Sequence, residues 1–303
     1  MKKSLRKVIV AVIALVISIG VATSTTFAWF SMNNTVTITG LTIQTTVSSN
    51  LFIAEDTLGS TSKKGDEFFV SSVDTAIGPV LVEPTSTVDG KKFFYTIDAK
   101  ADGSKDQLTS VDPYVVYNAV EVPTSTELTA FNTAYGTTNA VGYVDYVVQL
   151  KAVNTDTTNA KDIKITQLDL TYATTGTVVN GIKAYRVALF VEDITTTSPA
   201  GGSGTLVGIY TPASAVNHTS GKAVKTTTDL DSVTYNAATR LTQVTANSTE
   251  YFKVVIRLYL EGEDTTCTND TFLELTANWS FDVTFEFDTA TSNVTNLTVK
   301  SAE

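Results

Sequence analysis

Along most of the chain, apolar and polar residues alternate with a period of two, the pattern of β-strands with one buried face. The alternation is cleanest over residues 281–287, where four apolar residues are separated by Asp, Thr and Glu. It is also clear over residues 144–150 and 252–260. Residues 182–191 are apolar on both sides, which predicts a buried central strand, with a short helix as the alternative. No segment after residue 28 shows a sustained helical period.

Two segments shift the phase of their alternation by one residue, which a β-bulge or a bend can absorb. In one of them, Ile163 and Ile165 are followed by Leu168. In the other, the shift falls at Gly40, near the start of the chain. The apolar positions around it are Val36, Ile38, Leu41, Ile43 and Val47. This second segment is a β-prone strand that must pair with another strand.

Many short strands separated by turn residues, without βαβ alternation, predict the fold class. We expect an all-β, jelly-roll-like antiparallel β-sandwich with elaborated loops, preceded by an N-terminal signal-peptide helix. The sandwich domain spans residues 49–303, and residues 56–142 are interpreted as an insertion or elaborated edge of its main sheet. Within that insertion, residues 80–82 lie between two prolines, which predicts an edge strand or an extended loop.

The first 28 residues are patterned differently from the rest. Four basic residues among the first seven precede an apolar run of 15 residues, from Val8 to Ala22, and then a polar, small-residue segment. This is the layout of a secretory signal peptide. Cleavage after Ala28 would place Thr26 at position −3 and leave Trp29 as the new N-terminus. A membrane anchor is the alternative, although the run is shorter than the roughly 20 residues that a spanning helix needs.

Residues 25–31, Thr-Thr-Phe-Ala-Trp-Phe-Ser, resemble the processing site of the TasA and camelysin family. In that family a dedicated signal peptidase cuts within a Thr-aromatic-Ala stretch followed by Phe-Ser or Phe-Asn. Its members are exported jelly-roll subunits that form biofilm-matrix fibres, in which the N-terminal strand of one subunit completes the sheet of the next. The resemblance implies that residues 29–48 are a donor strand. It also implies that the partners are further copies of the chain and, during export, the signal peptidase.

Charge and cysteine content agree with an exported protein. The net charge is −10, and removal of residues 1–28, with four positive charges and no acid, would make it −14. Such a chain lacks the basic character expected of a nucleic-acid-binding protein. Cys267 is the only cysteine, so no intrachain disulfide and no four-cysteine zinc site can form. We expect a protein of the extracellular matrix or cell surface that meets a membrane only through an uncleaved N-terminal segment.

The sequence shows no motif for catalysis. The one histidine, His218, and the lack of a His-Glu-x-x-His motif argue against a zinc protease, although camelysin-like proteins are often described as metalloproteases. A Ser-His-Asp triad would have to use His218 in a polar loop, without a Gly-x-Ser-x-Gly stretch. Many carboxylates are present, but their spacing selects no glycosidase pair. We therefore predict that the chain is not an enzyme and has no organic cofactor.

Calcium is the one ligand that the acidic residues could hold. The denser cluster consists of Glu261, Glu263 and Asp264, directly after a strong strand, with a polar hairpin loop as the alternative. Residues 98–106 resemble the start of a Ca²⁺ loop, but Lys100 occupies a position where Asp or Asn belongs. A solvated turn is the alternative there.

Two functions from different classes follow. The first is a secreted structural subunit that polymerises into extracellular filaments by donating its N-terminal strand, whose apolar side chains fill pockets in the next subunit. The second is a monomeric secreted or surface-anchored sandwich that binds a glycan or protein through its loops. In that case residues 29–47 pair with their own sheet.

Overall fold

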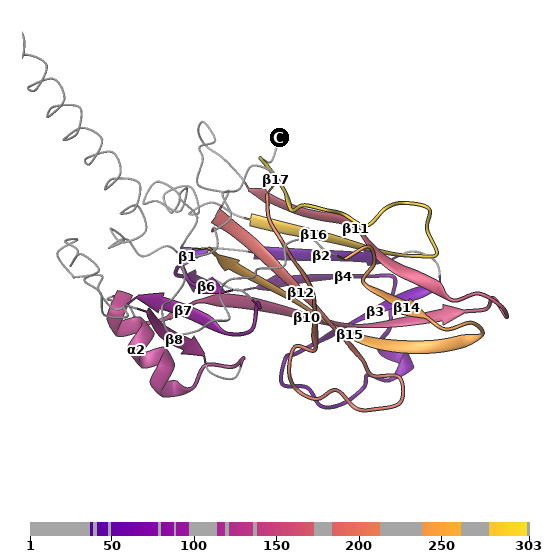
Figure 1. Ribbon diagram of the computed structural model, residues 1–303, viewed down its shortest axis with the longest axis horizontal. Coiled ribbons are helices and arrows are strands. Elements are labelled where there is room, and N and C mark those ends of the chain that lie inside the picture. Colours follow the sequence, from indigo (N-terminus) through magenta and orange to yellow (C-terminus); the bar gives the residue numbers. More distant parts are fainter. Residues whose placement is uncertain are drawn as a thin grey trace, which may run out of the picture.

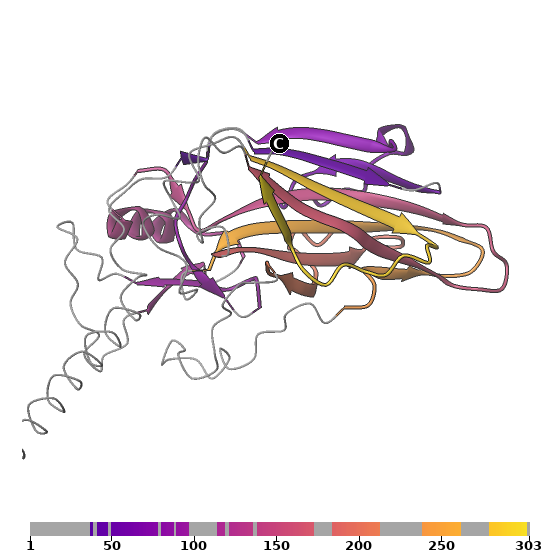
Figure 2. The same cartoon turned by 90° about the horizontal axis from the view of Figure 1, so that it is seen from above.

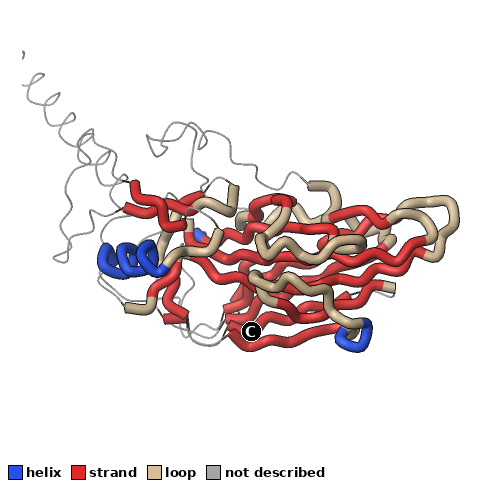
Figure 3. Tube along the Cα trace, turned by 90° about the horizontal axis from the view of Figure 1, so that it is seen from below, coloured by secondary structure: helices blue, strands red, loops and turns tan. Residues whose placement is uncertain are grey.

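The structure, a computed structural model, describes residues 37–38, 41–47, 50–77, 80–87, 89–96, 114–118, 121–135, 138–172, 184–212, 238–261 and 279–301. These residues form an all-β sandwich with one α-helix at one end (Figure 1, Figure 3). The predicted β-sandwich is therefore confirmed, whereas the predicted signal-peptide helix lies outside the described residues.

Two sheets make the layers of the sandwich. The first is antiparallel, in the order β13-β12-β15-β10-β3. Its strands are β13 (Thr205–Tyr210), β12 (Tyr185–Asp193), β15 (Ser248–Leu260), β10 (Tyr143–Asn154) and β3 (Leu51–Asp56). The second has the order β14-β11-β16-β2-β4, with β17 also beside β11. Its strands are β14 (Thr242–Val244), β11 (Lys161–Tyr172), β16 (Trp279–Phe287), β2 (Leu41–Val47), β4 (Ser72–Ile77) and β17 (Thr298–Ser301).

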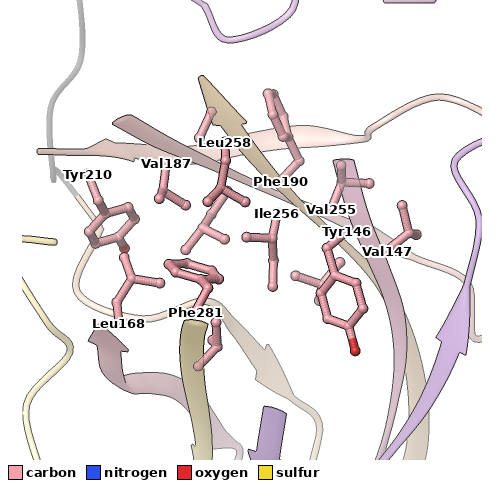
Figure 4. Close-up of a cluster of buried hydrophobic side chains, with 14 of the residues drawn as sticks. Tyr146, Val147, Leu168, Val187, Phe190, Tyr210, Val255, Ile256, Leu258 and Phe281 are labelled. Atoms are coloured by element: carbon pink, nitrogen blue, oxygen red, sulfur yellow. The ribbon is translucent and has the colours of Figure 1, made fainter. Parts of the chain in front are cut away.

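The main core fills the space between the two layers (Figure 4). Val187 and Ile256 from the five-stranded sheet and Phe281 from the six-stranded sheet are fully buried there. The prediction of a central strand within residues 182–191 is confirmed, because β12 lies inside its sheet and its first six residues are buried. A strand in this position needs apolar residues on both faces, since a second layer covers its outer face.

The predicted bulge after Ile165 is also confirmed. The register of β11 against β16 shifts between Ile165 and Gln167. The extra residue returns the apolar set to the core, so Ile163, Ile165 and Leu168 are all buried.

Most of the smaller elements lie within residues 56–142, the predicted insertion. Two three-stranded sheets have the orders β1-β5-β9 and β6-β7-β8. Their strands are β1 (Thr37–Ile38), β5 (Val80–Val82), β9 (Ala140–Val141), β6 (Ser86–Thr87), β7 (Phe93–Thr96) and β8 (Tyr114–Asn118). A 3₁₀ turn, η2 (Asp66–Phe68), precedes β4. Because β5 is the central strand of its sheet, the prediction of an edge strand or loop there is wrong: the prolines flank its three paired residues without replacing one.

The helix α2 (Ser125–Tyr135) contradicts the expectation that no helix follows residue 28. Its start is a capping box, in which the Thr124 amide donates to Glu127 Oε2 at 2.7 Å and the Glu127 amide donates to Thr124 Oγ1 at 3.2 Å. Phe131 is fully buried and anchors the helix against the rings of Tyr95 and Tyr117. The Thr-x-x-Glu spacing was the available signal, since a helix rich in Thr and Ala has only a weak apolar stripe.

Arg257 fastens the β6-β7-β8 sheet to the outer face of the five-stranded sheet. Its buried guanidinium donates to both carboxylate oxygens of Asp145, at 2.6 and 2.8 Å, and to the Gly90 carbonyl at 2.8 Å. It also lies 4.1 Å from the centroid of the Tyr143 ring. Gly90 has a φ of 66°, and a Cβ there would come within 2.8 Å of the Phe190 ring, so this turn requires glycine.

We expect Asp145→Ala to lower the free energy of unfolding by roughly 3 kcal/mol, because it leaves a buried guanidinium without its carboxylate. Urea denaturation measures this loss. Glu55→Ala, which removes an exposed carboxylate from β3, is the control and should change stability by less than about 0.5 kcal/mol. Equal effects of the two substitutions would contradict this role of the ion pair.

Candidate functional site: the position of the N-terminal strand

The predicted donor strand, residues 29–48, contributes β1 and β2 to the structure. β2 lies inside the six-stranded sheet, between β16 and β4, along one side of the molecule (Figure 2). It runs parallel to six residues of β16 and antiparallel to six residues of β4. Both edges of β2 are thus paired with strands of the same chain.

The residues that the sequence singled out in this segment fall into two different sheets. Ile38 belongs to β1 and pairs with Val80 of β5, whereas Leu41, Ile43 and Val47 belong to β2. Ile43 is fully buried, and its register partner on β16 is Phe281. The phase shift at Gly40 therefore coincides with a change of sheet between Ile38 and Leu41. Val36 lies outside the described residues.

A cluster of hydroxyl groups joins β2 to the opposite layer. Tyr146 projects from β10 into the interior (Figure 4), and its hydroxyl faces those of Thr45 on β2 and Thr75 on β4. Burial raises the pKa of Tyr146, and Thr45 is fully buried. None of the three oxygens has a partner with full hydrogen-bond geometry. Sequence reasoning missed Thr45 because it is polar, although it continues the alternation of Leu41 and Ile43.

The outer face of β2 is held by a row of polar side chains. The hydroxyls of Thr46 and Thr284 on β16 are 3.1 Å apart. Thr284 donates to Gln167 Oε1 at 2.9 Å, and Gln167 donates to Asp169 Oδ2 at 2.7 Å. The outer faces of β2 and β16 are therefore joined through the Thr46–Thr284 contact.

β2 ends at Val47 in one layer, and β3 begins at Leu51 in the other. Asn50, directly before β3, has a φ of 67°, a left-handed conformation that asparagine tolerates better than other non-glycine residues. Its carbonyl accepts a hydrogen bond from the Val153 amide at 2.9 Å.

The structure describes only one of the residues in the other predicted sites. Glu261 is fully buried beside Thr85, but Glu263 and Asp264 lie outside the described residues, as do the cleavage-site residues Thr26, Ala28 and Trp29. Within the described part of the chain, no group of three His, Cys, Asp or Glu side chains could hold a metal ion. No helix of that part is long and apolar enough to cross a membrane.

Comparisons with protein-family models, curated proteins and solved structures found no match for this chain. The likeness of residues 25–31 to the TasA and camelysin processing site thus stays a prediction from sequence. A functional proposal has to come from the position and contacts of the N-terminal strand itself.

A buried carboxyl lies next to the strand that holds β1. Glu83 directly follows β5 and is 3% exposed, and its amide donates to the Val141 carbonyl at 2.9 Å. Burial raises the pKa of Glu83 to about 8. The folded chain therefore keeps this carboxyl protonated at neutral pH, whereas the unfolded chain ionises it.

We expect stability to depend on pH through Glu83. Between about pH 4.5 and pH 8 the unfolded state binds fewer protons at this site than the folded state, so stability falls as the pH rises. The loss across that window is on the order of 3–5 kcal/mol, and the contribution of Glu83 to stability is complete below about pH 4.5. Glu83→Gln should flatten this part of the profile, measured by urea denaturation at several pH values. An identical decline in the wild type and the variant would contradict the assignment.

We expect Tyr146→Phe to lower the free energy of unfolding by about 1–2 kcal/mol, because it removes the one hydroxyl that faces both Thr45 and Thr75. Replacing all three groups, in Tyr146→Phe with Thr45→Val and Thr75→Val, should recover most of that loss, since no buried hydroxyl then remains. Thermal and urea unfolding of the wild type, the single variant and the triple variant would test this. A triple variant that is less stable than Tyr146→Phe alone would contradict this role of the three hydroxyls.

Proposed function

We propose that this chain is an exported structural subunit that polymerises by exchanging its N-terminal strand with the next copy. The observation that carries the proposal is the interior position of β2, the first long strand of the described chain. If β2 withdrew, it would open a slot between β16 and β4. The segment that fits this slot is β2 of another copy.

Exchange of this kind conserves the contacts of the closed subunit. The pairing with β16 and β4, the burial of Ile43 and the Thr46–Thr284 contact would be the same whether β2 comes from its own chain or from another. Swapping an identical element is therefore a low-cost route to association. If each copy donates to one neighbour and accepts from another, the contact does not close and produces a filament.

The sequence before β2 supports export as the trigger. A basic start, an apolar run and the Thr-Thr-Phe-Ala-Trp-Phe-Ser stretch resemble the export and processing signals of matrix-fibre subunits. Removal of the first 28 residues would release the N-terminal strand only after export, so assembly would begin outside the cell. The net charge of −14 expected after cleavage keeps free subunits soluble.

One observation favours the second function. In the structure β2 pairs within its own chain, as expected of a monomeric secreted binding module that contacts glycans or proteins through its loops. The two functions differ in whether β2 contacts β16 of its own chain or of another.

A pair of cysteines distinguishes these two arrangements. We expect Thr46→Cys with Thr284→Cys, in a Cys267→Ser background, to form a disulfide, because the two positions are register partners with hydroxyls 3.1 Å apart. In residues 29–303 at high concentration, strand exchange would link each copy to the next. A non-reducing denaturing gel would then show a ladder of oligomers that collapses on reduction.

Each single-cysteine variant serves as a control and should give at most a dimer. Electron microscopy of the wild-type protein beside a version that starts at Ser48 checks the same point, since only the longer form carries a strand to donate. If the oxidised double variant runs solely as a monomer, strand exchange is wrong and the monomeric binding module is favoured.

A further inference from the structure

β4 forms an outer edge of the six-stranded sheet (Figure 2). Its inner edge pairs with β2, and no strand among the described residues pairs with its outer edge. The strand reads Ser-Val-Asp-Thr-Ala-Ile, without the lysine, proline or bulge that commonly protects an edge strand. An unprotected edge of this length is a template for pairing with a further strand.

Two exposed apolar side chains lie on the segment that leads into this edge. Three large hydrophobic side chains are exposed in the described residues, and two of them, Phe68 (59% exposed) and Val70 (44%), lie on the segment that leads into β4. Phe68 and Val73 of β4 also line a hollow of about 500 Å³. Its other lining residues are Glu55, Asp56, Thr57 and Lys64. Exposed apolar side chains next to a free strand edge indicate an interaction surface.

We propose that the outer edge of β4 joins two copies of this chain, with the two β4 strands antiparallel about a two-fold axis through Thr75. The contact is isologous, which means that the same surface is used by both copies. It goes beyond the proposed function, because it involves neither the N-terminal strand nor the slot between β16 and β4.

The amino-acid sequence of β4 selects this register. Residues that face each other across the axis must lie on the same face of the pleated sheet, so the axis passes through a residue. An axis at Thr75 pairs Thr75 with Thr75, Val73 with Ile77 and Asp74 with Ala76. Threonine pairs and β-branched pairs of this kind stabilise antiparallel strands.

The neighbouring registers are worse. An axis at Asp74 places two carboxylates directly opposite each other, which is destabilising. An axis at Ala76 pairs only residues 75–77 of the described strand, whereas an axis at Thr75 pairs residues 73–77. β4 can therefore pair with a second β4 in the register about Thr75. For this reason we propose a second copy of the chain as the partner of this edge.

The contact would merge two six-stranded sheets into one continuous sheet. An isologous contact closes at two copies and cannot extend a filament by itself. Combined with strand exchange it would instead join two filaments side by side, a consequence that depends on the proposed function.

The first test uses Thr75→Cys in a Cys267→Ser background of the full chain, kept dispersed in mild detergent. Because each chain then has one cysteine at the axis, oxidation should give a dimer band and no larger species. Thr129→Cys, on the exposed side of α2, is the matched control and should remain monomeric. No more dimer from Thr75→Cys than from this control would overturn the proposal.

The second test changes the charge opposite Asp74. Ala76 is exposed, so Ala76→Asp and Ala76→Lys should both fold, and their thermal unfolding can be compared directly. We expect Ala76→Asp to weaken dimerisation about tenfold by two like-charge pairs, and Ala76→Lys to strengthen it at low salt, measured by sedimentation equilibrium. A shift in the same direction for both variants would show that the register is wrong.

The two proposals fail separately. If the Thr46–Thr284 ladder is absent but the Thr75 dimer forms, strand exchange is wrong and the β4 contact stands. If the ladder forms and the Thr75 dimer does not, the β4 contact is wrong.

Discussion

The six-stranded sheet depends on having β2 in place between β16 and β4. Buried backbone amides and carbonyls need hydrogen-bond partners, and β2 supplies them to both neighbours at once. An empty slot would expose two facing strand edges together with the buried side chains around Ile43. The chain must therefore keep this slot filled, either with its own β2 or with the same segment of another copy.

Several features of the closed subunit bear on how readily β2 leaves. β1, which ends three residues before β2 and pairs with β5, would have to move with the strand. Asn50, which directly precedes β3, adopts a left-handed conformation. On the inner face of β2, Thr45 meets the hydroxyls of Tyr146 and Thr75 without full hydrogen-bond geometry. These contacts are specific for β2 but leave part of its polar surface unsatisfied.

The slot and the outer edge of the sheet are physically connected. In the described structure β2 is the strand with which β4 pairs, so a filled slot supports this edge along six residues. Val70, just before β4, is also hydrogen-bonded to Ile53 of β3. Occupation of the slot thus organises the surface that a second copy would meet. A filament built by strand exchange would have every slot filled, and would present one β4 edge for each subunit.

The sequence by itself determined the all-β class, the buried central strand β12, the bulge after Ile165 and a β-strand near the start of the chain. These features are local, because the period of two and its breaks are carried by neighbouring residues. The helix α2 also has a local signal, its capping box, but the apolar periodicity of the segment does not reveal it.

Only the tertiary structure decided which strands lie side by side. It separated β1 from β2, placed β5 at the centre of a small sheet and put β2 between β16 and β4. It also joined Arg257 to Asp145, and the Tyr146 hydroxyl to those of Thr45 and Thr75. The physical reason is that pairing and layer order arise from contacts between residues far apart in the chain, and such contacts leave no mark on the alternation within a single strand.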